Sequence, residues 1–173
     1  MKINKLELKN ISYYERGSEE TPCYNATVYI NGKKAVEVSN DGHGGCDRQH
    51  VYHENGFNLK EIDEYCVKTF GTEKYEWGEV ENDLEHWCQR EMFIAQDKKL
   101  LKRTMKKNVM FFENKEDISK GRYYLYKIQN DVMSLMAYVK DKYPQSIILN
   151  DMSFDDALKT FRNEVASWTI YNG

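Results

Sequence analysis

The pair Asn31–Gly32 constrains the fold of this 173-residue chain more strongly than any other feature. It joins two runs rich in β-branched and aromatic residues, at residues 23–30 (CYNATVYI) and 33–39 (KKAVEVS). Asn and Gly both tolerate the positive φ angles that a two-residue type I′ turn requires. The pattern therefore predicts an antiparallel β-hairpin. Residues 2–9 alternate apolar and charged side chains and predict another strand before it.

Helical periodicity begins after the hairpin region. Asn58 matches a helix N-cap and Gly71 a helix stop, so a helix is expected between them. Residues 72–79 (TEKYEWGE) are expected to form a short link, and residues 79–107 a long helix. Acidic side chains gather near the start of this long helix and basic ones near its end, which complements the helix dipole.

The last third of the chain returns to strands and then to helices. Two strands separated by a polar turn, and a short apolar piece, are predicted at residues 109–112, 123–128 and 146–149. One helix is predicted at residues 131–142, and another after Ser153, which has capping-box spacing to Asp156. Three apolar residues should face inward from the last helix: Phe154, Leu158 and Phe161. Residues 164–173 are expected to add a strand or to pack Trp168 on the core.

The order of strands, helices, strands and helices predicts the α+β fold class. We expect a single domain over residues 1–173, with an antiparallel sheet, an N-terminal β-hairpin and several helices packed mainly on one face. A chain of this length is long enough to bury a sizeable core.

Charge and hydropathy narrow the class of partner. The chain has 25 basic and 28 acidic residues, a net charge of −3, so it lacks the global basic field of a general nucleic-acid binder. No stretch approaches the roughly 20 apolar residues of a membrane span, and the start lacks an apolar signal core. We therefore expect a cytoplasmic protein with no membrane partner, whose four cysteines are reduced.

Residues 40–56 (NDGHGGCDRQHVYHENG) hold most of the candidate chemistry. They contain three of the four histidines, one cysteine, and three glycines within the four residues after Asp41. No other segment combines so much backbone freedom with so many possible ligands. The residues that we single out here for binding are Asp41, His43, Gly44, Gly45 and Tyr52.

A zinc site is one interpretation of this segment. The pattern H-x2-C-x3-H-x2-H is formed by His43, Cys46, His50 and His53. Zinc accepts these donor types, and His50 and His53 would share a face if the segment were helical. The order matches no standard zinc finger, however. The favoured expectation is therefore no cofactor, with zinc as the alternative.

Anion binding is a second interpretation. The glycines could aim backbone N–H groups at a phosphate, as anion-binding nests do. The segment contains neither a P-loop nor a Rossmann fingerprint, and Asp41 would repel a phosphate.

Catalysis is a third interpretation. Cys46 could form a thiolate pair with His43 or His50, or the histidines could act with nearby carboxylates such as Asp47 in a nuclease. The spacing specifies no known mechanism. The sequence therefore favours a non-catalytic protein over an enzyme.

The basic end of the long helix is a further candidate contact surface. The binding residues that we expect there are Lys99, Lys102, Arg103 and Lys106. Compensation of the helix dipole explains basic residues at a helix end, and an acidic partner is the alternative explanation. The 13 tyrosines also suit a protein with a large contact surface.

Three segments in this order resemble a group of small proteins of bacteriophages and other mobile elements. They are SEETPCYNATVYINGKKAVEVSNDGHGGC, KRTMKKNVMFFEN and SIILNDMSFDDALKTFRN, and the group's GG loop falls on Gly44 and Gly45. Some similar phage proteins inhibit bacterial immunity, anti-CRISPR proteins among them, by binding a host defence protein or its nucleic acid.

The resemblance implies a phage-encoded inhibitor without catalytic residues that works in the host bacterial cytoplasm. Its partner would be a host defence protein or its nucleic-acid complex, and a homo-oligomer is compatible with this function. The alternative is a metal-dependent protein that binds or processes nucleic acid through His43, Cys46, His50 and His53.

Overall fold

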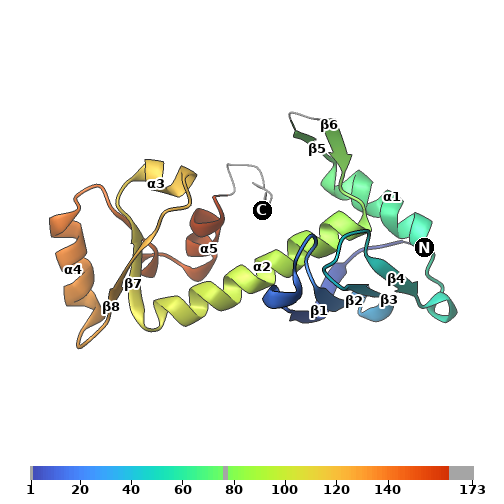
Figure 1. Ribbon diagram of the computed structural model, residues 1–173, viewed down its shortest axis with the longest axis horizontal. Helices are drawn as coiled ribbons and strands as arrows, with labels where there is room; N and C mark the ends of the chain where they lie inside the picture. The colour runs from blue at the N-terminus through green and yellow to red at the C-terminus, as the bar shows by residue number, and fades with distance from the viewer. Residues whose placement is uncertain (1, 76–77, 164–173) are drawn as a thin grey trace. The chain divides into compact units, whose positions relative to one another are not determined.

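The protein is α+β, with an antiparallel four-stranded sheet in its N-terminal part followed by helices (Figure 1). The computed structural model describes residues 2–75 and 78–163. The chain divides into two compact units, Met1–Gln96 and Asp97–Gly173, and each is described by itself. The predicted single domain over residues 1–173 stays a prediction.

The first unit is built on an antiparallel sheet with strand order β1-β2-β3-β4. Its strands are β1 (Leu6–Tyr13), β2 (Tyr24–Ile30), β3 (Lys33–Asn40) and β4 (Arg48–Val51). The predicted hairpin is confirmed, since β2 pairs with β3 across Asn31 and Gly32, which have φ angles of 50° and 83°. The opening strand lies further along the chain than residues 2–9. The sequence did not predict β4.

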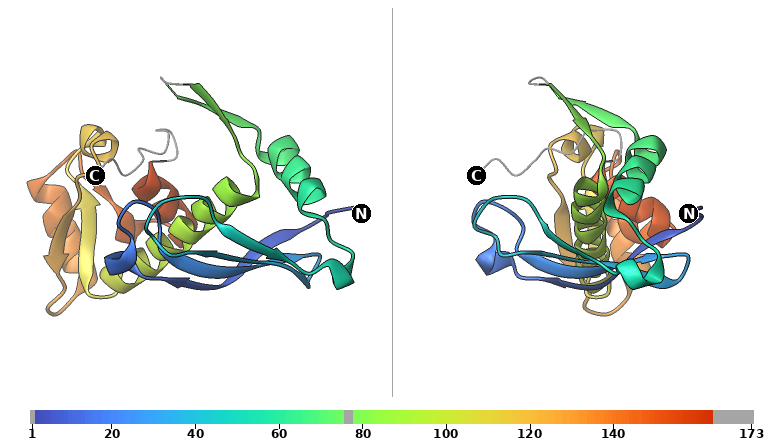
Figure 2. Two further views of the ribbon diagram at one scale, coloured as in Figure 1. Left: turned by 45° about the vertical axis from the view of Figure 1, so that its right-hand side comes forward. Right: turned by 90° about the vertical axis from the view of Figure 1, so that its right-hand side faces the viewer.

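One face of this sheet forms the core of the first unit. Its inward side chains come mainly from β2 and β3, and they pack with Ile62 and Cys66 of α1 (Leu59–Phe70) and with the first turns of α2 (Leu84–Met105). Both helices lie on the same side of the sheet (Figure 2). The Asn58 side chain accepts a hydrogen bond from the Lys60 N–H and caps α1 as predicted.

The predicted link at residues 72–79 is wrong. Two antiparallel strands occupy this region instead, β5 (Thr72–Tyr75) and β6 (Gly78–Glu81). Helix α2 consequently begins at Leu84 rather than at residue 79. The Asp83 side chain accepts a hydrogen bond from the His86 N–H at 2.9 Å, which satisfies an N–H group of the first turn.

The second unit contains a sheet with strand order β8-β7-β9. The strands are β7 (Asn108–Phe112), β8 (Tyr124–Lys127) and β9 (Ile147–Ile148). Alternate residues of β7 pack on opposite sides. Val109 and Phe111 pack with residues of α4 (Val132–Lys142), while Met110 and Phe112 pack with Leu101 and with residues of α5 (Phe154–Arg162).

Helix ends in the second unit follow the predicted caps, with two differences. Ser153 accepts a hydrogen bond from the Asp156 N–H and starts α5 as expected. The turn between β7 and β8 contains a short helix, α3 (Lys115–Ser119), which Asn114 caps. Phe154 does not face inward, because it lies at the exposed first position of α5 with 38% of its surface accessible.

Leu158 is buried, and Phe161 packs against the same cluster. The prediction for residues 164–173 lies outside the described residues. Among the described residues, no helix is long and apolar enough to cross a membrane.

Candidate functional site

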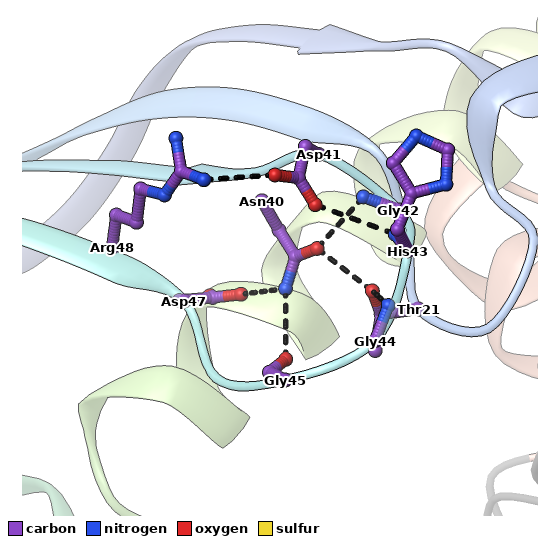
Figure 3. A network of polar contacts seen from close by, with 9 residues as sticks. All are labelled: Thr21, Asn40, Asp41, Gly42, His43, Gly44, Gly45, Asp47 and Arg48. Carbon is purple, nitrogen blue, oxygen red and sulfur yellow. Dashed lines mark hydrogen bonds and ion pairs between the residues drawn. The ribbon is translucent and has the colours of Figure 1, made fainter.

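The side chain of Asn40 organises the glycine-rich loop between β3 and β4 (Figure 3). Its Oδ1 accepts hydrogen bonds from the Gly42 N–H at 2.9 Å and from the Thr21 hydroxyl at 2.7 Å. Its Nδ2 donates to the Gly45 carbonyl at 3.2 Å and to Asp47 Oδ1 at 3.0 Å. Because both ends of a buried carboxamide are used, the loop has a fixed internal framework.

Gly42 fits its position because no side chain could occupy it. Its φ angle is +88°, and a Cβ there would lie 1.8 Å from the carbonyl oxygen of Gly17. The Gly42 carbonyl accepts N–H donors from residues 19, 20 and 21 at 3.0, 2.9 and 3.3 Å. The loop is therefore closed against the connection between β1 and β2.

These contacts bear on the anion-binding interpretation. The Gly42 N–H is already bonded to Asn40, and the Gly44 N–H donates to the Thr21 hydroxyl at 3.2 Å. Two of the three glycine N–H groups are thus used inside the loop, so they are not directed at a ligand.

The far end of the loop is anchored in the core through Asp47, which is 9% exposed. The Tyr24 hydroxyl donates to Asp47 Oδ2, and the Asp47 N–H donates to Glu85 Oε1 on α2 at 3.1 Å. Burial raises the pKa of Asp47, although hydrogen bonds from Tyr24 and Asn40 act in the opposite direction. Burial also raises the pKa of Glu85.

The structure gives the candidate zinc ligands separate partners. His43 Nδ1 lies 3.3 Å from the Glu19 carboxylate, the ring of His50 packs edge-on against Tyr52, and His53 Nδ1 lies 3.1 Å from the carbonyl oxygen of Phe57. The helical arrangement of His50 and His53 is wrong, because His50 lies in β4. Over residues 2–75 and 78–163, no group of three or more His, Cys, Asp or Glu side chains is placed to hold a metal ion.

The candidate thiolate pair is not assembled either. Cys46 is exposed, and within the described part of the chain it has no hydrogen bond to a histidine. Asp41 pairs with Arg48 at 2.9 Å and also accepts a hydrogen bond from the His43 N–H at 3.4 Å. Asp41 and His43 therefore lie together at the exposed rim of the loop (Figure 3).

The outer face of the first sheet is a feature that sequence reasoning missed. It forms an open groove of about 400 Å³, whose lining includes Asn10, Asn25, Ser39, Arg48, Gln49 and His50. The register places Lys9, Thr27, Glu37 and His50 in one row across the four strands. Alternating polar residues in β2 and β3 were the available signal.

Tyr52 lies beside this face. Its hydroxyl donates to Glu37 Oε1 at 2.5 Å, and the ammonium of Lys34 lies 5.7 Å from its ring centroid. The candidate residues Asp41, His43 and Tyr52 are thus carried by neighbouring segments of the first unit, together with Arg48, which the sequence analysis did not single out.

The basic candidate residues belong to the second unit. Lys99, Lys102, Arg103 and Lys106 are all exposed. The spacing of three and four residues puts Lys99, Lys102 and Arg103 on one face of α2, opposite the buried Leu101, and Lys106 follows directly after the helix. These four residues are called the basic face of α2. Among the residues that the structure describes, none of the four forms an ion pair.

Comparisons with protein-family models, curated proteins and solved structures give no match. The functional assignment therefore rests on the sequence pattern and on the geometry of the chain. The resemblance to small phage proteins stays a prediction.

Proposed function

We propose that this protein is a phage-encoded, non-catalytic inhibitor that binds a component of a host bacterial defence system and blocks it sterically. The observation that carries this proposal is the preformed glycine-rich loop beside an open polar sheet face. The partner would be a defence protein or its nucleic-acid complex in the host cytoplasm. The class of partner comes from the sequence resemblance.

Preorganisation supports a binding role. Immobilising a loop on association lowers affinity, and a loop already held by Asn40 avoids most of that entropic loss. The adjoining surface offers Arg48, with 78% of its side chain exposed, together with His50 and Tyr52. Arginine and tyrosine are enriched in protein interfaces, because they combine large contact area with directed hydrogen bonds.

The proposal assigns no catalytic residue. His43, His50 and His53 each contact a different neighbour, and within the described residues Cys46 has no hydrogen bond to any of them. The basic face of α2, formed by Lys99, Lys102, Arg103 and Lys106, is a separate contact surface under this proposal. Metal analysis of the purified protein tests the alternative: stoichiometric zinc that is lost on His50→Ala would favour a metal-dependent function.

A plaque assay tests the proposal directly. Bacteria that carry an active CRISPR–Cas system would express the wild-type chain or the double variant Arg48→Glu with His50→Glu, and would be challenged with a targeted phage. We expect the wild type to raise plaque formation and the double variant to lose at least tenfold of that effect, because charge reversal at an interface centre costs about 2 kcal/mol or more.

Lys60→Glu is the matched control. Lys60 is 83% exposed on α1, away from the sheet groove, so the variant should act like the wild type. If the double variant keeps full activity while its unfolding midpoint is unchanged, the sheet face is not the contact surface. If the wild type protects phage against none of a panel of defence systems, the proposed class of partner is wrong.

A further inference from the structure

The net charge of −3 conceals a strong asymmetry between the two units. Residues 1–96 contain 18 acidic and 11 basic side chains, a balance of −7. Residues 97–173 contain 10 acidic and 14 basic side chains, a balance of +4. The second unit by itself is therefore basic. A basic half in a chain whose other half is acidic indicates an anionic partner for the basic half.

The basic face of α2 extends beyond what a helix dipole explains. The dipole acts within the last turn of a helix, whereas Lys99 lies before the last turn of a helix that ends at Met105. Strand β8 pairs with β7, which follows this helix, in the register Asn108↔Lys127, and the Ile128 N–H donates to the Lys107 carbonyl at 3.0 Å. Lys127 is exposed and adds a positive charge on the strand beside the end of α2.

A cluster of aromatic rings around one lysine adjoins this strand. The ammonium of Lys142 lies 5.8, 5.7 and 5.3 Å from the ring centroids of Tyr126, Tyr138 and Tyr143. The hydroxyls of Tyr126 and Tyr143 are 3.0 Å apart, and Lys142 donates to the Tyr126 hydroxyl at 3.3 Å. Phe111 packs against the rings of Tyr126 and Tyr143 and supports the cluster from the core.

The cluster presents both charge and a stacking surface. Hydrogen bonding with Tyr126, Tyr138 and Tyr143 raises the pKa of Lys142, so its side chain stays a cation at neutral pH. Tyr138 is 51% exposed and Tyr123, just before β8, is 39% exposed. Exposed tyrosine rings of this kind accept nucleic-acid bases on their faces, and each stacked base contributes about 1–3 kcal/mol.

We propose that the second unit binds single-stranded nucleic acid, with phosphates on the basic face of α2 and a base stacked on Tyr138 beside Lys142. Paired bases in a duplex are stacked on each other and offer no free face to a tyrosine, so the exposed rings favour a single strand. An acidic protein would use the lysines but gain little from Tyr138. The inference shares the basic face of α2 with the proposed function, but its test measures binding of free single strands, whereas the plaque assay tests the sheet face of the first unit through Arg48 and His50, so either proposal can fail alone.

Fluorescence anisotropy with the full chain and a labelled 20-nucleotide single-stranded DNA or RNA of mixed sequence tests this inference. We expect binding that weakens as salt rises, with a log–log slope of about −0.7 for each phosphate contacted. Replacing three lysines by glutamine, at Lys99, Lys102 and Lys106, should weaken binding at least tenfold and reduce the slope by about 2.

Substitutions at Tyr138 separate the contribution of stacking to the affinity from the contribution of charge. Tyr138→Ala should weaken binding roughly 5- to 150-fold without changing the salt slope, while Tyr138→Phe, which keeps a ring, should bind like the wild type. Because Tyr138 is exposed, its truncation leaves the core intact, and unfolding in urea checks this. Lys60→Gln in the first unit is the matched control for loss of one exposed lysine.

Three results would overturn the inference. The first is no binding to the single strand at 50 mM salt and micromolar protein. The second is equal affinity of Tyr138→Ala and the wild type. The third is tighter binding to an acidic polypeptide such as poly-glutamate, which would identify the basic face of α2 as a surface for an acidic protein.

Discussion

The glycine-rich loop and the basic face of α2 were both candidate binding regions, yet they use their polar groups in opposite ways. In the loop, Asn40, Gly42 and Gly44 are bonded to other groups of the protein (Figure 3). On the basic face, Lys99, Lys102 and Lys106 have no ion-pair partner within the described residues. The polar groups of the loop are therefore explained by the hydrogen bonds that they make within the fold. The unpaired lysines of the basic face have no such role in the fold.

The comparison leads to an ordering of substitutions by their effect on stability. Changes inside the loop framework should destabilise the protein, since they remove buried hydrogen bonds or create clashes. Changes on the basic face should leave stability almost unchanged and alter binding instead.

The largest effect is expected from Gly42→Ala. A methyl group there would meet the Gly17 carbonyl at 1.8 Å and would also force a non-glycine residue into positive φ, so the free energy of unfolding should fall by about 4 kcal/mol. Gly45→Ala is the control, because Gly45 has a similar φ of +87° but a methyl group there would meet none of the described residues within 4 Å. This variant should lose only about 1 kcal/mol in the free energy of unfolding. Urea denaturation measures both, and equal losses would mean that the loop does not pack closely on Gly17.

Asn40→Ala comes next. It removes four hydrogen bonds and leaves the buried Gly42 N–H donor and the buried Asp47 Oδ1 acceptor without their Asn40 partner, so we expect a loss of about 3 kcal/mol in the free energy of unfolding. Asn55→Ala is the control, since the Asn55 side chain donates one exposed hydrogen bond to the Lys34 carbonyl and should lose less than about 1 kcal/mol. Similar unfolding midpoints for the two variants would show that the Asn40 side chain does not hold the loop.

A pH series on Asp47→Asn probes the buried end of the loop. Burial raises the pKa of Asp47 in the folded protein, whereas the unfolded chain releases that proton near pH 4. The stabilisation from protonated Asp47 is thus complete below about pH 4 and is lost as pH rises through the raised pKa. In that window the wild type should lose stability with pH faster than Asp47→Asn, by at most about 1.4 kcal/mol per pH unit. Parallel curves in urea unfolding would show that Asp47 is not desolvated.

The smallest effect is expected on the basic face. Lys99→Gln combined with Lys102→Gln should change the free energy of unfolding by no more than about 0.5 kcal/mol, because both side chains are exposed and unpaired among the described residues. Thermal unfolding provides the measurement. A loss as large as that of Asn40→Ala would mean that these lysines stabilise the fold, and the contrast between the two regions would disappear.

The elements that the sequence predicted well are those with local signals. Asn31–Gly32 specifies the β2–β3 turn, and Asn58 and Ser153 cap α1 and α5 through contacts only two or three residues away. Strand β4 was missed because its formation depends on pairing with β3, as in the Val36–Val51 pair, and no short stretch of sequence encodes that register.

The composition of the glycine-rich loop located the candidate site, but it did not predict which groups its side chains bond to. Asn40 reaches Thr21, Asp47 reaches Tyr24, and the Asp47 N–H reaches Glu85, across 19, 23 and 38 positions of the chain. Such distant contacts turn apparent ligands and flexible glycines into parts of the framework. Sequence spacing also suggested a shared face for His50 and His53, which the pairing of β4 with β3 prevents.

The shared acceptor at the Gly42 carbonyl has a consequence for local unfolding. Because the N–H groups of residues 19–21 bond to this single oxygen, the connection before β2 and the loop after β3 should open and close as one cooperative unit. Their amide protons should then exchange with solvent at a common rate, and a protease able to cleave one segment should at the same moment find the other accessible.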